Sequence, residues 1–439
     1  MSDNHTQPVV VIGAGPVGLA AAAHLAERHL PFLVLEAGDR PGDAVRQWGH
    51  VRLFSPWCYN IDAAARRQLD RSAWAAPDPD ALPTGGDLID QYLTPLARLP
   101  AIAPHVRYRA RVVAVTRLGL DRVRSSGRDG TPFLIRLSDG TDLTARAVID
   151  ASGTWTTPNV LGGSGIPAHG ETDPEVAALV DPAIPDVLGG DRHRYAGRHT
   201  LVVGAGHSAA TTLLALAALT ETEPGTAVSW AIRTSSAART YGGGEDDPLP
   251  ARGALGTLLH DRVRTGRIRL LNGFSVQALR AVPDGGLEVD GRQPDGTTQT
   301  VIVDRIVAAT GFRPDHTITG ELRLDLDPIL GSGRALAPLI DPDQHSCGTV
   351  PAHGVDELTH PERNYFTVGV KSYGRAPTFL MATGYEQVRS IAAALAGDWE
   401  AARDRRGLAT GVTGGPLSAP LALIPVGAPH DRPAGGGRR

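Results

Sequence analysis

Val9-Val10-Val11-Ile12-Gly13-Ala14-Gly15-Pro16-Val17-Gly18 is the stretch that decides the fold of this 439-residue chain. Its four apolar residues end at a glycine and predict a fully buried parallel strand. Gly13 permits a tight turn, Gly15 lets a pyrophosphate approach the backbone, and Gly18 lets the next helix pack closely on the strand. The N-terminus of that helix presents free N–H groups and a positive dipole end to phosphates.

A second strand, Phe32-Leu33-Val34-Leu35, follows this helix and ends at Glu36. An acidic side chain at the end of this strand can accept hydrogen bonds from a ribose diol. The strand, the glycine turn, the helix and the acid occur in the order that a dinucleotide-binding unit requires. The alternative is a glycine-rich turn that holds no ligand.

Composition limits the classes of function. A chain of this length is expected to hold two or three domains. The formal net charge of -4 offers no basic face for nucleic acid. Residues 1–8 lack the apolar segment of a signal peptide, and no apolar run reaches membrane-spanning length, so we expect a cytoplasmic protein without membrane contact. Cys58 and Cys347 lie far apart and outside any CxxC, which argues against a dithiol redox centre.

The segment after Glu36 carries groups that would suit a bound cofactor. It includes Gln47 and Trp48 within the run from Arg46 to Trp57. Indole and guanidinium groups here would stack on, or bond to, a cofactor that extends beyond its adenosine half. A loop anchored by buried tryptophans is an equally good interpretation.

Alternating patterns then predict a helix and a small β meander. The helix is expected to run to about Arg98, with Asp87 or Gly86 as its cap. Three strands follow, and Ser138-Asp139-Gly140 has the composition of a hairpin turn between the last two. Their expected ranges are 111–118, 132–137 and 143–151. The last range includes Ala147-Val148-Ile149-Asp150, which we predict to return to the parallel sheet.

The opening pattern recurs in the middle of the chain. After a Gly- and Pro-rich linker over 158–197, an apolar strand leads into Gly204-Ala205-Gly206-His207-Ser208-Ala209 and a helix to about Leu219. The next strand, 227–232, ends at Arg233, where the first unit has Glu36. A carboxylate suits a free ribose 2′-hydroxyl, whereas an arginine suits a 2′-phosphate. The first site should therefore prefer FAD or NAD and the second NADPH, unless Arg233 is an unpartnered surface arginine.

Further strands complete the two units. They are expected over 267–271, 286–289, 300–303, 305–309 and 364–369. The acidic, glycine-rich stretch 241–247 fits either a mobile lid or an ordinary exposed loop. Lys371, the only lysine in the chain, lies in the loop before a helix expected to open near Pro377. The chain after Gly397 turns polar, and its Gly/Pro-rich end over 401–439 is predicted to be disordered.

Together these motifs resemble the flavoproteins with two dinucleotide-binding domains. The resemblance covers about residues 8 to 397 and includes Ala309-Thr310-Gly311-Phe312. The second glycine motif is similar to that of class B flavin monooxygenases, and the run 371–377 resembles actinobacterial flavin-binding monooxygenases, some of which lie in arsenic-resistance clusters. The stretch 161–170 only partly matches the class B fingerprint, because it lacks the leading Phe and the closing aromatic residue. Thioredoxin-reductase-like enzymes share the plan but carry a CxxC.

The resemblance implies an α/β fold with two Rossmann-like domains and a small antiparallel meander. The FAD domain would be discontinuous, over 1–158 and 305–400, with the NADPH domain inserted at 159–304. FAD and NADPH are the implied cofactors, and no metal is expected. The cofactor-binding residues implied in the first domain and the linkers are Gly13, Ala14, Gly15, Pro16, Gly18, Glu36, Gln47, Trp48, Val113, Gly153, Thr310, Gly311 and Gly369. Those implied in the second domain are Gly204, Gly206, His207, Ser208, Ala209 and Arg233.

The resemblance also implies a reaction. NADPH would reduce the flavin, and oxygen would add at flavin C4a to give a peroxide that oxygenates sulfur, nitrogen or a trivalent metalloid. Lys371 and Arg375 are the candidate catalytic cations, with exposed loop positions as the alternative. A reductase or oxidase, with Cys58 as a redox thiol, and a flavin- or nucleotide-binding sensor without turnover remain as other classes. O2 and a small-molecule substrate are the expected partners, and a homodimer is left open.

Overall fold

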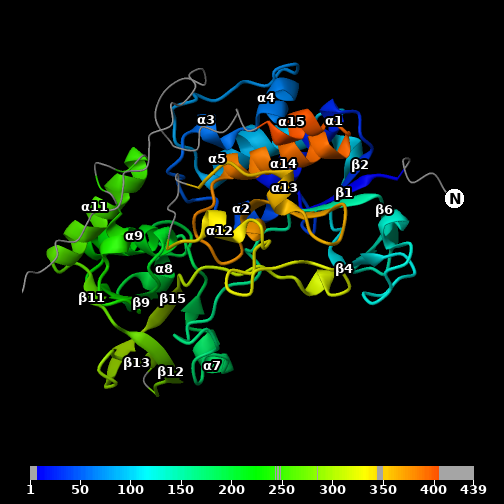
Figure 1. Cartoon of the computed structure of the whole chain (residues 1–439). Coiled ribbons are helices and arrows are strands. Elements are labelled where there is room, and N and C mark those ends of the chain that lie inside the picture. The colour runs from blue at the N-terminus through cyan, green and yellow to red at the C-terminus, as the bar shows by residue number, and fades with distance from the viewer. Residues whose placement is uncertain are drawn as a thin grey trace, which may run out of the picture.

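The computed structural model describes residues 7–242, 244, 247, 249–283, 285–343 and 350–404. Its architecture is two parallel sheets, each covered by helices on one face and by a small antiparallel sheet on the other (Figure 1). The predicted α/β fold with two similar units and an antiparallel meander is therefore confirmed. Cys347 and the chain from 405 onward lie outside the described residues, as does part of the stretch 241–247.

The first parallel sheet has the strand order β16-β7-β1-β2-β3. The bounds of its strands are β1 (Val9–Ile12), β2 (Phe32–Leu35), β3 (Val106–Arg107), β7 (Ala147–Asp150) and β16 (Tyr365–Thr367). β1 is central, with Val9 paired to Phe32 on one side and to Ala147 on the other. All four side chains of β1 are buried because both faces of the sheet are covered, which explains the uninterrupted apolar run.

The two faces of β1 enter two different cores. Val9 and Val11 pack with the helices α1 (Pro16–Glu27) and α14 (Met381–Leu395). Val10 and Ile12 pack against the antiparallel meander of β4 (Val112–Arg117), β5 (Phe133–Leu137) and β6 (Asp142–Ala145). This alternation follows from the two-residue period of a strand. Figure 1 shows α1 and α14 above the sheet and the meander below it.

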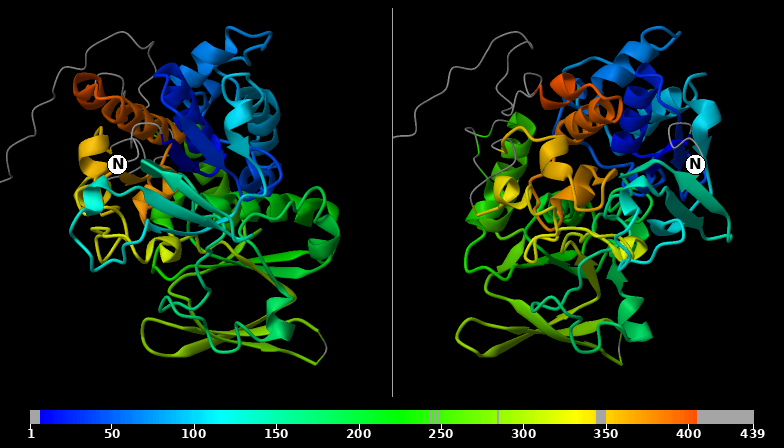
Figure 2. Two further views of the ribbon diagram at one scale, coloured as in Figure 1. Left: turned by 90° about the vertical axis from the view of Figure 1, so that its right-hand side faces the viewer. Right: turned by 45° about the vertical axis from the view of Figure 1, so that its right-hand side comes forward.

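The second sheet repeats this plan with the order β11-β10-β9-β15-β8. Its strands are β8 (Val180–Asp181), β9 (His199–Val203), β10 (Ala227–Ala231), β11 (Arg269–Leu271) and β15 (Arg305–Ala308). Helices α9 (His207–Thr222) and α11 (Pro250–Arg264) cover one face. The antiparallel sheet of β12 (Ser275–Ala281), β13 (Leu287–Arg292) and β14 (Thr298–Val303) covers the other. Figure 2 shows this second unit, in green, below the first.

Short helices join these elements. They are α2 (Asp43–Arg46), α3 (Trp57–Asn60), α4 (Ala63–Leu69), α5 (Gly85–Leu88), η1 (Ile89–Leu93), α6 (Thr94–Ala97), η2 (Ala103–His105), η3 (Arg128–Gly130), α7 (Pro174–Ala177), α8 (Arg192–Tyr195), α10 (Ala238–Tyr241), η5 (Thr317–Thr319), α12 (Ala337–Ile340), α13 (Val355–Leu358), η6 (Gly369–Tyr373) and α15 (Trp399–Arg403).

Several expected bounds need correction. β15 pairs with β9 and β8, so this strand belongs to the second sheet although the boundary at 305 assigned it to the first domain. The helix α14 begins at Met381 and not near Pro377. Thr84, and not Asp87 or Gly86, caps α5, because its hydroxyl accepts from the N–H of Asp87 in a capping box. α15 extends past the expected domain end at 400, and β12 was not predicted.

Two linkers connect the domains and lie side by side. The N–H of Asn159 donates to the carbonyl of Gly311 (2.9 Å), and the N–H of Arg313 donates to the carbonyl of Thr157 (3.0 Å). The rings of Trp155 and Phe312 are 4.8 Å apart between centroids. The chain therefore crosses between the domains twice at one place.

Candidate functional site

The first glycine turn has the shape of a phosphate cradle. Gly13 has φ of 100°, in the left-handed region that favours glycine. A Cβ on Gly18 would lie 2.0 Å from the carbonyl oxygen of Gly13, so this glycine is required for α1 to pack on β1. A Cβ on Gly15 would meet nothing within 4 Å. Gly15 therefore faces open space, where a pyrophosphate would lie.

The N-terminus of α1 is capped by no side chain. Gly15 occupies the capping position, and Pro16 begins the helix, where a missing N–H costs no hydrogen bond. The buried carboxylate of Glu36 lies against the same turn. It accepts from the N–H of Ala14 (2.6 Å) and from the N–H of Gly38 (2.7 Å). The structure thus brings Ala14 and Glu36 together, as a ribose next to a pyrophosphate requires.

The loop residues expected near the cofactor have different surroundings. The side-chain oxygen of Gln47 accepts from the indole N–H of Trp155 in the first linker (2.8 Å). Trp48 packs so closely on Gly85 that a Cβ there would lie 2.8 Å from its ring. Trp48 thus supports the interpretation of an anchored loop. Val113 lies on β4 and is 43% exposed, so the edge of the meander is accessible there.

The second glycine turn has the same geometry as the first. Gly204 has φ of 137°, and a Cβ on it would lie 2.0 Å from the carbonyl oxygen of Ala309, the residue that follows β15. Gly206 caps α9 without a side chain and, like Gly15, faces open space. Ala209, on the first turn of α9, is fully buried. The repeat seen in the sequence is therefore also a repeat in shape.

The residues around the second turn come from both domains. His207 begins α9, with Ser208 next to it, and its ring lies 5.1 Å from that of Phe54, a first-domain residue that was not predicted. Arg233 follows β10 and is exposed, and its guanidinium donates to the carbonyl of Gly163 (3.0 Å). It has accessible N–H groups for an anion, as a 2′-phosphate site requires.

A third turn completes the first site. Gly369 has φ of 69°, and a Cβ on it would lie 3.4 Å from Val17 at the start of α1. Its N–H donates to the side-chain oxygen of Gln387 on α14 (2.8 Å), which holds η6 against this helix. Val370 lies at contact distance from Gly153, in the first linker. The glycine turn, the first linker and η6 therefore meet at one end of the first sheet.

Lys371 is not the free loop cation expected from the sequence. Its ammonium is buried and lies 2.7 Å from the carboxylate of Asp150 and 3.0 Å from the hydroxyl of Ser152. The hydroxyl of Tyr365 donates to the same carboxylate (2.8 Å). Asp150 was missed as a site residue, although an acid that ends a buried strand is a signal for a buried partner. Arg375, in contrast, is exposed.

The remaining expected residues lie in the linkers or away from them. The Thr310 hydroxyl donates to the carbonyl of Asn159 (2.8 Å), and Gly311 has φ of 84°. Cys58 is exposed on α3, and partial burial together with the carboxylate of Asp80 raises the pKa of its thiol. Because the thiolate is the reactive form, Cys58 is a poor redox centre at neutral pH.

The described residues lack two features that other proteins use for membrane insertion and metal binding. No helix among them is both long enough and apolar enough to span a membrane. No group of three or more His, Cys, Asp or Glu side chains among them could hold a metal ion.

The fold has two domains, each with a glycine cradle at the N-terminus of a long helix. A family model described as "FAD dependent oxidoreductase" matches residues 8–98, which include the first cradle and Glu36. Gly15 and Glu36 fit the pyrophosphate and ribose of FAD on their geometry. These findings indicate an enzyme, an FAD-dependent oxidoreductase.

Solved structures share this fold at low sequence identity. Bacillithiol disulfide reductase from Bacillus cereus is 20% identical with a TM-score of 0.63, and the match covers 89% of this chain and 99% of that one. The FAD-bound cadaverine monooxygenase of desferrioxamine biosynthesis from Erwinia amylovora is 13% identical with a TM-score of 0.63, over 97% and 99%. A flavin-containing monooxygenase from Stenotrophomonas maltophilia is 22% identical with a TM-score of 0.51, over 89% and 99%. No curated protein matches the sequence.

Proposed function

We propose that this chain is an NADPH- and FAD-dependent monooxygenase that acts on a soft nucleophile, such as sulfur, amine nitrogen or a trivalent metalloid. The observation that supports this proposal is the pair of similar glycine turns with side chains of opposite charge at corresponding positions. These side chains are Glu36 in the first domain and Arg233 in the second. Bound FAD would accept a hydride from NADPH and pass its electrons to O2.

The residues of the first domain would hold the flavin nucleotide. The turn at Gly15 and the N-terminus of α1 would bind the pyrophosphate, and Glu36 would accept from the adenosine ribose. Gly369 and the turn η6 would lie at the flavin end. Lys371 would act there as a positioning residue, because Asp150 already neutralises its charge. Arg375, which is exposed just beyond the turn, stays the candidate for a cation that contacts an anionic group.

The residues of the second domain would hold NADPH. Gly206 and Ser208 at the N-terminus of α9 would bind its pyrophosphate, and Arg233 its 2′-phosphate. Phe54 reaches His207 from the other domain and would lie beside the bound nucleotide. The two cradles would then orient the nicotinamide toward the flavin.

A reductase or oxidase is the second candidate, because solved neighbours include disulfide and thioredoxin reductases. The raised pKa of Cys58 argues against this residue as the thiol of such a reaction.

The deciding experiment measures how much oxygenated product and how much hydrogen peroxide form for each NADPH consumed. FAD-loaded protein is mixed with NADPH, O2 and a panel containing a thioether, a tertiary amine and a trivalent arsenical. A monooxygenase consumes one NADPH for each oxygenated product. NADPH consumption matched by hydrogen peroxide with every compound would contradict the proposal and favour an oxidase. Protein that NADPH cannot reduce without air would indicate a sensor.

A further inference from the structure

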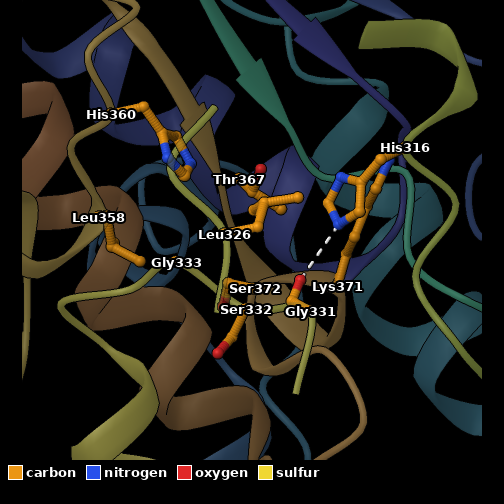
Figure 3. A pocket seen from close by; sticks show the side chains of 10 residues that line it. All are labelled: His316, Leu326, Gly331, Ser332, Gly333, Leu358, His360, Thr367, Lys371 and Ser372. Atoms are coloured by element: carbon orange, nitrogen blue, oxygen red, sulfur yellow. Dashed lines mark hydrogen bonds between the residues drawn. The ribbon is translucent and has the colours of Figure 1, made fainter. Parts of the chain in front are cut away.

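Two cations lie at the candidate nucleotide sites, and their surroundings differ. Lys371 lines a small internal cavity of the first domain (Figure 3) and is paired with the buried carboxylate of Asp150. Arg233 in the second domain is exposed, and no acidic side chain among the described residues forms an ion pair with it. Its guanidinium donates instead to the carbonyl oxygen of Gly163 (3.0 Å). Arg233 therefore keeps its charge for an external anion, while a backbone carbonyl holds its side chain.

One carboxylate organises the loop 161–170, which contains this carbonyl. One oxygen of Glu171 accepts from the N–H of Leu161 (2.7 Å), at the start of the loop. The other oxygen accepts from the N–H of Gly162 (3.2 Å) and from the N–H of Ala168 (2.7 Å). Hydrogen bonds to an ionised carboxylate are stronger than those between neutral groups. Glu171 therefore ties both ends of the loop together.

The position of Gly163 is also fixed from the side of the antiparallel sheet. Its N–H donates to the carbonyl of Val276 on β12 (2.9 Å). A Cβ on Gly163 would lie 2.0 Å from the hydroxyl oxygen of Ser275, on the same strand. The loop is thus held between Glu171 and β12, and the carbonyl of Gly163 has one defined position.

A defined carbonyl position matters because an exposed arginine side chain otherwise samples many rotamers. Ordering such a side chain when a ligand binds costs conformational entropy, and this cost weakens binding. A guanidinium has five N–H donors in one rigid plane, so the bond to Gly163 leaves four of them for a ligand. Arg233 would therefore meet a phosphate with its side chain already ordered.

We propose that Glu171 is a positioning residue for the selection of NADPH over NADH. It acts through the loop 161–170, whose carbonyl at Gly163 holds the guanidinium of Arg233 in place for a 2′-phosphate. The carboxylate of Glu171 faces the backbone of its own loop and is not itself a nucleotide ligand. The inference rests on the proposed function, because it requires NADPH to bind at Arg233.

The test measures the dissociation constants of NADPH and NADH by fluorescence titration of the FAD-loaded full chain. Glu171→Gln keeps the size of the side chain but replaces one acceptor oxygen by an N–H2 group that faces backbone donors. We expect the ratio of the NADH constant to the NADPH constant to fall about 3- to 10-fold, because Arg233 must then be ordered by the ligand. General damage to the domain would weaken both nucleotides alike. An unchanged ratio would overturn the proposal.

Asp295→Asn is the matched control. The carboxylate of Asp295 also accepts from a backbone N–H of the second domain, that of Thr297 (2.9 Å), but it does so in the turn between β13 and β14. This variant should keep the wild-type ratio. A fall equal to that of Glu171→Gln would show that the ratio does not report on the loop 161–170, and would contradict the proposal.

A double-mutant cycle separates this inference from the proposed function. If Glu171 acts through Arg233, adding Glu171→Gln to Arg233→Ala should not change the ratio further, and a further fall would overturn the proposed route. If Arg233→Ala lowers the ratio and Glu171→Gln does not, the inference alone is wrong. If Arg233→Ala itself leaves the ratio unchanged, the proposed NADPH site is wrong, and the inference is wrong with it.

Gly163→Ala tests the same carbonyl without a change at Glu171, and it carries the test if Glu171→Gln does not fold. The new Cβ would lie 2.0 Å from the hydroxyl oxygen of Ser275 and 3.1 Å from its Cβ, so residue 163 must shift together with its carbonyl. The ratio should fall as it does in Glu171→Gln. A folded Gly163→Ala protein with the wild-type ratio would contradict the role of this carbonyl.

Discussion

The ammonium of Lys371 lies 2.7 Å from the carboxylate of Asp150, and both side chains are almost wholly buried. The pair joins the end of β7 to the turn η6, two segments 221 positions apart in the chain. Burial acts to raise the pKa of Asp150, but Lys371 and Ser152 outweigh it and hold that pKa below its usual range. Lys371, at the candidate flavin end of the site, is therefore part of a neutral ion pair and is not a free cation.

Lys371→Met should destabilise the protein by about 3–5 kcal/mol, because it leaves the Asp150 carboxylate buried without a counter-charge. The double variant Asp150→Asn with Lys371→Met should regain most of this loss, and urea denaturation measures both. Since the pKa of Asp150 is lowered in the folded protein, the pair contributes stability above about pH 4 and loses it at more acid pH. In Lys371→Met the Asp150 carboxyl group is buried without a counter-charge, so it takes up a proton in the folded state at a higher pH than in the wild type. The difference in stability between wild type and Lys371→Met should therefore narrow as the pH falls from 7 to 4. The ion pair would be contradicted if the difference in stability between wild type and Lys371→Met did not change with pH. It would also be contradicted if the double variant were no more stable than Lys371→Met.

Gly15→Ala and Gly18→Ala should have opposite consequences. The Cβ on Gly15 would meet nothing, so this variant should fold with an unchanged melting temperature and bind FAD about tenfold or more weakly, a loss of at least ~1.4 kcal/mol. The Cβ on Gly18 would strike the carbonyl of Gly13, so Gly18→Ala should lose stability. Gly206→Ala is the control. This variant should weaken the binding of NADPH and leave the binding of FAD unchanged. If Gly15→Ala binds FAD with wild-type affinity, the proposed binding of the pyrophosphate at this turn is wrong.

Arg233→Ala should weaken NADPH binding by about 10- to 100-fold and NADH binding far less, because only NADPH carries the 2′-phosphate. Fluorescence titration with each nucleotide measures the two affinities. Arg280→Ala is the matched control, since Arg280 is an exposed arginine of the same domain that pairs with Glu288 and Asp290. Equal losses for both nucleotides would exclude a phosphate contact of Arg233.

Cys58→Ser should leave NADPH oxidation and product formation unchanged. The raised pKa of the thiol also predicts slow alkylation at pH 7 that accelerates only in alkaline solution. Mass spectrometry after timed exposure to iodoacetamide measures this rate. Loss of activity in Cys58→Ser would favour a thiol-dependent reductase.

His360 should make the protein acid-sensitive. Burial, and secondarily His316, lowers the pKa of His360 to about 4, whereas an unfolded chain binds this proton near pH 6.5. The unfolded state thus holds more protons between these values, so stability falls as the pH decreases from 6.5 to 4, by about 3 kcal/mol. His360→Asn, whose carbonyl can still accept from the N–H of Asp325, should flatten this slope.

The control for this prediction is His193→Asn, an exposed position on α8, and its slope should follow that of the wild type. Urea midpoints at pH 6.5, 5.5 and 4.5 measure the three slopes. If His360→Asn and the wild type lose stability in parallel, His360 is not the group responsible.

Much of the first site could be predicted because its signals are local. Gly13, Gly15 and Gly18 lie within one strand, turn and helix, and their spacing alone sets which of them faces the helix and which faces open space. The predicted cap of α5 and the predicted start of α14 were wrong, since the structure has them at Thr84 and Met381. Several neighbouring residues could cap or begin each helix, and the sequence does not rank them.

The assignment of β15 needed the tertiary structure. Its apolar residues Ile306, Val307 and Ala308 would suit either parallel sheet, and only its pairing with residues more than 100 positions earlier in the chain decides that it joins β9. The same holds for Phe54, which reaches His207 across the domain boundary.

The sequence by itself determined two cradles, a carboxylate at the tip of one and a guanidinium at the tip of the other. These features depend on the strand period and on glycine geometry, which act over about 30 residues. Only the tertiary structure decided the state of Lys371. The sequence around Lys371 does not indicate which residue pairs with it. Asp150 lies next to Lys371 only because β7 and β16 pair in one sheet.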